Sequence, residues 1–220
     1  MTPRAGAAAL ALVFGLLVPL GQHAHAANRY EPRFRFQTIS TPRFAIHFHQ
    51  GEEAIARRLA RIAEEVAGRV DAGLGRANGR VHVILVDQSD LSNGWASPAP
   101  YNLIEIAAAA PPGALTIGNT DDWLRLVFSH EYTHVVHLDK VHGWIGGLRR
   151  VFGRNPILFP NLFLPLWQVE GIATYNESAL TGQGRVPAGD FRNIVDRAAS
   201  AGRFEPLDRA NGGLIDWPSG

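Results

Sequence analysis

The sequence lacks several features that define large classes of proteins. It contains no cysteine among its 220 residues, so disulfides cannot support the fold and a metal site built from thiolates is excluded. The formal net charge is only +1, which gives no electrostatic reason to expect nucleic acid as a partner. After the first 26 residues, no apolar run is long enough to predict a membrane-spanning helix. Any metal ligands must therefore come from histidine and carboxylate side chains.

The N-terminus has the pattern of a secretory signal peptide. Arg4 provides positive charge, residues 8–20 are apolar but too few to cross a bilayer as a helix, and Ala24-His25-Ala26 is a small-residue cleavage site. We expect residues 1–26 to be removed and the protein to be exported to the periplasm, the cell surface or the outside of a bacterium. The alternative is that these residues stay as an uncleaved anchor.

Two further segments follow. Residues 27–40 are polar and predict an extended lead-in, whereas residues 41–220 have the size of a single domain. Residues 214–220 have a turn-like sequence with no closing helix or strand. This ending predicts that the domain is truncated and belongs to a longer protein.

Hydrophobic periodicity predicts an α+β fold. The order is strand, helix, strand, strand, helix, helix, which predicts a small mixed sheet packed on the helices. The sequence indicates strands at 44–48, 81–86 and 102–108, and the last is expected to be an edge with a short partner at 115–117. It indicates helices at 52–72 and 121–138, and a third that begins near 165 and carries residues 167–180. Thr120 is the expected N-cap of the middle helix. Residues 87–100 are expected to form a loop, and residues 139–165 an apolar insert with many glycines and prolines.

The middle helix carries His130-Glu131-Tyr132-Thr133-His134. Spacing of four residues places both imidazoles on one helical face, where they can bind one Zn²⁺ ion. Glu131 lies beside them and could take a proton from a metal-bound water, as a general base in amide hydrolysis. A catalytic zinc needs a third protein ligand. Glu170 is the strongest candidate, because an unpaired carboxylate on an otherwise apolar helix would be costly. The small residues Gly171 and Ala173 would let that helix approach closely.

These motifs resemble the gluzincin branch of the peptidase MA-like superfamily of zinc peptidases. The resemblance covers roughly residues 120–180 and combines the H-E-x-x-H stretch with W-x-x-E-G-x-A-x-Y-x-E at 167–177. It implies a zinc metallopeptidase with one Zn²⁺ held by His130, His134 and Glu170, with Glu131 as general base. It also implies that Glu177 orients a ligand histidine. The 35 residues between His134 and Glu170 form a longer gap than in the thermolysin-like or aminopeptidase enzymes. Exported relatives of this kind often continue into a C-terminal β-propeller, which is the expected partner in cis.

Several other residues have two interpretations. His137 shares the face of the motif and could support or replace a ligand, but a packed or solvated histidine at a helix end is the more common case. Asp139 could accept a hydrogen bond from a ligand histidine or simply end the helix. Residues 157–165 could pack in the core, roof the cleft or contact a membrane surface. Simple structural roles are expected for the remaining residues: a solvated strand face for His47 and His49, core positions for Trp167 and Tyr175, and a solvated basic surface for Arg149, Arg150 and Arg154.

The function therefore has one main hypothesis and one rival. The main hypothesis is an exported zinc metallopeptidase that hydrolyses a peptide or protein substrate, which could add as a strand to the expected edge near Ile104. The rival is a non-catalytic binding domain of a larger envelope protein. A structural zinc site is disfavoured because three ligands leave one position open. A donor for the oxyanion is missing, since no histidine follows Glu170 and Tyr175 lies within the ligand helix itself.

Overall fold

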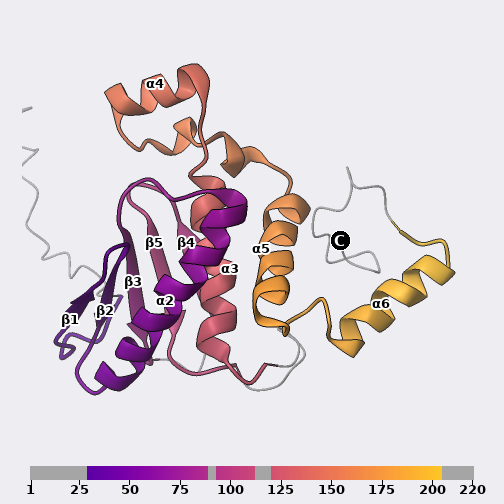
Figure 1. The fold of residues 1–220 in the computed structure, drawn as a ribbon, viewed down its shortest axis with the longest axis horizontal. Helices are drawn as coiled ribbons and strands as arrows, with labels where there is room; N and C mark the ends of the chain where they lie inside the picture. Colours follow the sequence, from indigo (N-terminus) through magenta and orange to yellow (C-terminus); the bar gives the residue numbers. More distant parts are fainter. Residues whose placement is uncertain (1–28, 89–92, 112–119, 205–220) are drawn as a thin grey trace, which may run out of the picture. The chain divides into compact units, whose positions relative to one another are not determined.

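The computed structural model describes residues 29–88, 93–111 and 120–204. The expected signal peptide, the expected short strand at 115–117 and residues 205–220 lie outside this part. From Phe34 onward the described chain forms one compact unit, with a sheet on one side and helices on the other (Figure 1). None of the described helices is long and apolar enough to cross a membrane.

The described residues form a five-stranded mixed sheet in the order β1-β2-β3-β5-β4. Strands β2, β3 and β5 are parallel, whereas β1 and β4 pair antiparallel at the two edges. In β3, buried residues alternate with partly exposed ones, whereas in β2 every residue except His47 is buried. The bounds are Gln37–Ser40 for β1, Phe44–Phe48 for β2, Val81–Val86 for β3, Gly94–Ser97 for β4 and Leu103–Ala107 for β5.

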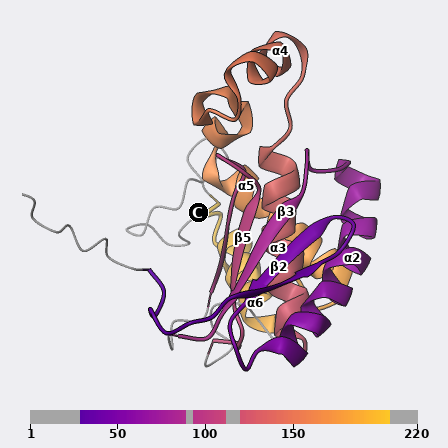
Figure 2. The ribbon, with the colours of Figure 1, turned by 90° about the vertical axis from the view of Figure 1, so that its left-hand side faces the viewer.

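Helices α2 (Glu53–Leu74) and α3 (Trp123–Leu138) pack against the buried face of this sheet (Figures 1 and 2). Phe44 of β2 is fully buried and meets Phe128 and Tyr132 of α3, with ring centroids 5.4 Å apart in both pairs. Helix α5 (Leu166–Thr181) packs against α3 as well. Helix α3 therefore has neighbours on nearly all sides, which buries its polar residues together with its apolar ones. The predicted α+β class is confirmed.

Four expectations about the elements are wrong. The strand at 102–108 is internal, because β5 pairs with both β3 and β4. The two edges are β4, which lies in the expected loop at 87–100, and β1, which lies in the expected lead-in. The N-cap of α3 is Asp122, whose carboxylate accepts from Arg125 N at 3.2 Å. Thr120 instead donates its hydroxyl to Gln183 Oε1 at 2.9 Å.

The insert between α3 and α5 has regular structure that the sequence did not predict. It contains helix α4 (Gly143–Phe152) and two short 3₁₀ helices, η1 (Pro156–Leu158) and η2 (Pro160–Phe163). A further helix, α6 (Gly189–Ser200), follows α5. Asp139, at the end of α3, anchors the insert: its carboxylate lies against the guanidinium groups of Arg149 and Arg154. The expectation of a solvated surface is therefore wrong for these two arginines, whose side chains are 7% and 23% exposed.

Candidate metal centre

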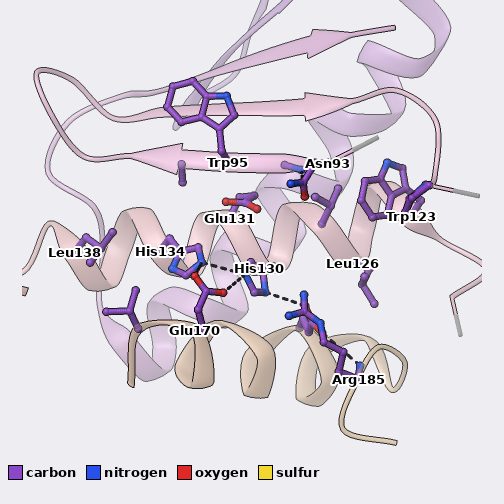
Figure 3. A pocket seen from close by; sticks show the side chains of 16 residues that line it. Asn93, Trp95, Trp123, Leu126, His130, Glu131, His134, Leu138, Glu170 and Arg185 are labelled. Carbon is purple, nitrogen blue, oxygen red and sulfur yellow. Dashed lines mark hydrogen bonds and ion pairs between the residues drawn. The ribbon is translucent and has the colours of Figure 1, made fainter. Parts of the chain in front are cut away.

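Helices α3 and α5 bring three side chains with metal-binding atoms to one point (Figure 3). His130 Nε2 and His134 Nε2 lie 3.0 Å apart on α3. The carboxylate of Glu170 on α5 faces both, with Oε2 at 3.3 Å from His130 Nε2 and Oε1 at 3.5 Å from His134 Nε2. Both histidines are buried, while the Glu170 side chain is about half exposed. The structure thus brings together the three ligands that the sequence indicates.

The spacing of these atoms fits a tetrahedral metal ion. Zinc holds nitrogen and oxygen ligands at about 2.1 Å, so two of its tetrahedral ligands lie about 3.4 Å apart. The three distances within the cluster, from 3.0 to 3.5 Å, are close to this value. Two imidazoles and one carboxylate leave a fourth position open, as in catalytic zinc sites. These residues could therefore hold a divalent metal such as zinc.

Glu177 supports His130 from the opposite ring nitrogen. Its carboxylate is fully buried, and Oε2 lies 2.8 Å from His130 Nδ1. When Nδ1–H donates to this oxygen, the lone pair of Nε2 is free to face His134 and Glu170. Glu177 in turn accepts from Arg185, through Nη2 at 3.2 Å and the backbone N–H at 3.4 Å. The contact that the family resemblance implies for Glu177 is present in the structure.

Arg185 is a site residue that the sequence analysis missed. It lines the same cavity as the histidines and donates from Nη1 to Thr174 Oγ1 at 3.3 Å. Two glycines with positive φ, Gly182 at 72° and Gly184 at 85°, turn the chain back along α5. This Thr-Gly-Gln-Gly-Arg stretch was the available signal, because glycines that end a helix and reverse the chain bring the next residue back against it. Arg185 supplies a cation near the metal ligands.

Glu131 lies on the side of α3 that faces strand β4 (Figure 3). It is buried, and this burial raises the pKa of its carboxyl group. A Cβ added to Gly94 of β4 would lie 2.6 Å from Val127 Cγ2 and 2.8 Å from Glu131 Oε1. The absence of a side chain at Gly94 therefore makes room for Glu131. A carboxylate with a raised pKa is suited to accept and return a proton near neutral pH.

His130 and Glu170 shift each other's pKa values. Burial alone would lower the pKa of His130, but its contacts with Glu170 and Glu177 outweigh burial and raise that pKa to about 9. The hydrogen bonds from His130 and His134 lower the pKa of Glu170 well below its usual range. A cation at this point is therefore favoured.

A cavity of about 600 Å³ opens between α3, α5 and β4. Its wall combines the metal-binding side chains, Glu131 and Arg185 with an apolar part (Figure 3). The apolar lining includes Trp95, Trp123, Leu126, Val127, Leu138 and Val169. The pocket is thus large enough for several atoms of a substrate beside the ligands, with edge strand β4 forming one wall.

The other candidates take different places. His137 is buried and does not belong to the ligand cluster, and Asn161 Nδ2 donates to its backbone carbonyl at 2.7 Å. Asp139 caps α3 and binds the arginines of the insert, so it contacts no ligand histidine in the described structure. Tyr175 is 66% exposed, so its expected core position is wrong. Of the two small residues expected to allow close helix packing, Ala173 is buried, whereas Gly171 has open space around its Cβ position.

A second group of possible ligands consists of His49, Glu52 and Asp87. His49 is buried, so the expectation of a solvated face is wrong for it. His49 Nε2 lies 2.6 Å from Asp87 Oδ1, which is a hydrogen-bond distance and too short for two ligands of one metal ion. Glu52 Oε2 accepts from the backbone N–H of His49 at 3.1 Å, at the start of α2. These contacts describe an ion pair that joins the ends of two strands to a helix.

A comparison with models of known protein families and with characterised proteins finds no match for this chain. The functional assignment therefore depends on the residues and their geometry.

Proposed function

We propose that this chain is the catalytic domain of an exported zinc metallopeptidase of gluzincin type. The observation that carries the proposal is the convergence of His130, His134 and Glu170 at distances suited to one tetrahedral ion. Zinc bound there would act as a Lewis acid and would supply an activated water at neutral pH. Two imidazoles and a single carboxylate are also a common ligand set of hydrolytic zinc enzymes.

The residues around the ligands have distinct roles in this proposal. Glu131 accepts a proton from the attacking water on its carboxylate and later gives it to the leaving amine. Its raised pKa supports both transfers. Glu177 holds His130 in the orientation and tautomer that metal binding requires. Arg185 offers a positive charge to the carbonyl oxygen of the substrate. It would thereby stabilise the oxyanion, for which the sequence has no histidine after Glu170.

Strand β4 gives a peptide substrate a place to bind. It is one of the two edge strands of the described sheet and pairs with β5 within the described residues. Gly94, Trp95 and Ala96 of this strand line the cavity next to Glu131. An extended peptide could add along β4 and place a peptide bond over the ligands. The substrate edge proposed from the sequence near Ile104 thus moves to β4, and a C-terminal β-propeller remains a proposed partner in cis.

Metal content and one conservative substitution test this proposal. The purified protein should contain about one zinc per chain. The Glu131→Gln variant should keep the zinc and lose hydrolysis of a peptide library. As a matched control, Glu53→Gln changes an exposed carboxylate on α2 and should alter neither. A folded wild-type protein that binds no zinc would overturn the whole proposal.

The same measurements distinguish the rival function, a non-catalytic binding domain. A wild-type protein with one zinc per chain that cleaves no peptide would favour the binding domain. Full hydrolysis by Glu131→Gln would show that another residue is the base.

A further inference from the structure

The insert presents a group of large apolar side chains to solvent. We call Trp144, Val151, Phe152, Ile157 and Phe163 the apolar face; each is between 68% and 75% exposed. No apolar residue of α4 is buried. Single exposed apolar residues are common on soluble proteins, but five large ones within one insert indicate a contact with something else.

The apolar face lies away from the rest of the structure. Helix α4 stands apart from the sheet and from α2, α3 and α5 in both ribbon views (Figures 1 and 2). Among the described elements, it packs chiefly against η1. Trp144 and Val151 are seven residues apart and therefore share one side of α4, with Phe152 next to them, while Arg150 lies on the opposite side. The helix is amphipathic, and no described element covers its apolar side.

The insert is nevertheless firmly held at its base. Phe159 is fully buried, and the guanidinium carbon of Arg149 lies 4.0 Å from the centre of its ring. Arg149 and Arg154 both reach the buried carboxylate of Asp139. These contacts fix the base of the insert, so the apolar face is exposed in a well-packed segment.

The charge of the insert identifies the kind of partner. From Lys140 to Val169 the sequence has four basic residues and no acidic residue. Two acidic residues flank this stretch: Asp139 is buried and paired with Arg149 and Arg154, and Glu170 belongs to the group of possible metal ligands. Lys140 and Arg150 are the two basic residues of the insert that do not pair with Asp139. A second copy of this insert would bring like charges together, whereas a surface of anionic lipid headgroups would attract them. Tryptophan and phenylalanine beside arginine are typical of helices that lie in the interface of a membrane.

We infer that the insert docks on an anionic membrane surface, with the apolar face entering the interface between headgroups and acyl chains. Such a contact would hold the catalytic cavity close to the membrane, although the inference does not depend on the proposed peptidase activity. It requires only that the apolar face and the basic residues act together, since neither alone gives strong attachment.

Vesicle binding by the full chain tests this inference. We expect it to sediment with vesicles of phosphatidylglycerol and phosphatidylcholine, less at high salt and less with phosphatidylcholine alone. Val151→Asp should reduce the bound fraction about tenfold, because it removes an inserted side chain and adds a negative charge. The matched control is Val195→Asp on α6, which changes a valine that is 52% exposed and should leave binding unchanged. The three proteins share the same N-terminal residues, so any binding through the apolar segment at 8–20 is common to all.

Three outcomes would overturn the inference. One is that Val151→Asp and Val195→Asp bind the vesicles equally well. Another is that binding to phosphatidylcholine alone equals binding to the anionic vesicles. The last is that sedimentation velocity shows a dimer which Val151→Asp dissociates, while vesicle binding stays unchanged; the apolar face would then be an interface between two copies. Circular dichroism of each variant confirms that its fold is intact, and Trp144→Phe gives an independent readout through the loss of a fluorescence shift on binding.

Discussion

Replacement of Glu177 by glutamine tests how the metal centre is supported. Glu177 is fully buried, accepts from His130 Nδ1 at 2.8 Å and receives two further hydrogen bonds from Arg185. Glutamine has nearly the same shape but no charge, and its amide can turn either oxygen or NH₂ toward the ring. Loss of such a partner behind a ligand histidine typically weakens metal binding 10- to 100-fold. The expected cost for zinc binding is therefore about 1.4 to 2.8 kcal/mol.

Competition with a chromophoric chelator measures this change as a zinc dissociation constant. The unfolding free energy of the metal-free variant is measured separately in urea, because Arg185 also loses a negatively charged partner. Glu53→Gln is the control, since that carboxylate is exposed on α2 and contacts Arg57. A Glu177→Gln variant with unchanged zinc affinity and an intact fold would refute the argument that Glu177 prepares His130 for the metal.

Three further predictions concern the surroundings of the site. Gly94→Ala should lower hydrolysis strongly while zinc is retained, because the new methyl group would collide with Val127 and Glu131. The control is Gly73→Ala on α2, where nothing lies within 4 Å of the added Cβ. Equal activity of the two variants would contradict the expectation. Asp139→Ala should lower the unfolding free energy by about 3–5 kcal/mol, since it leaves buried Arg149 without its carboxylate; a loss below 1 kcal/mol in urea unfolding would count against a buried pair. The third concerns pH. The pKa of His130 is raised from 6.5 to about 9 in the folded, metal-free protein, so its contribution to stability is complete below pH 6.5 and is lost as the pH rises to about 9. Thermal unfolding of the metal-free protein should show this loss, and zinc affinity should rise over the same interval because a proton no longer has to be displaced; stability that is flat over this interval would contradict the shift.

Much of the site could be predicted because its key contacts follow from short sequence spacings. His130, Glu131 and His134 share one helix, where a spacing of four residues fixes their faces. Glu170 and Glu177 share a second helix, and a spacing of seven residues places them on one side. The only long-range requirement is that the two helices pack together, which their apolar residues make favourable. Gly94 was missed because its role arises from a contact with Glu131, which is distant in the sequence. Arg185 lies only eight residues after Glu177, but its contact depends on the turn at Gly182 and Gly184.

The errors in the fold have related causes. Strand β4 reads Gly-Trp-Ala-Ser and all four residues are of intermediate burial, so it has no alternation to detect. The order of the sheet, with β5 inside and β4 at the edge, depends on pairing between distant segments. Helix α4 contains Gly146 and Gly147 at its centre, which lowers its intrinsic helix propensity. Arg149 resembles a surface residue in the sequence, and only the carboxylate of Asp139 explains its burial.

The net charge of the cavity lining favours the binding of a divalent cation. With neutral imidazoles, the lining holds three carboxylates, Glu131, Glu170 and Glu177, and one cation, Arg185, which gives a net charge of −2. A pocket with two uncompensated negative charges in a largely buried site is unfavourable. The metal-free protein can reduce this charge by protonating His130, in agreement with its raised pKa. In the proposed function, a bound divalent cation would cancel this charge and Glu131 would act as the base. The same charge balance predicts that a divalent ion, and not a monovalent one, restores the stability that the metal-free protein loses at high pH.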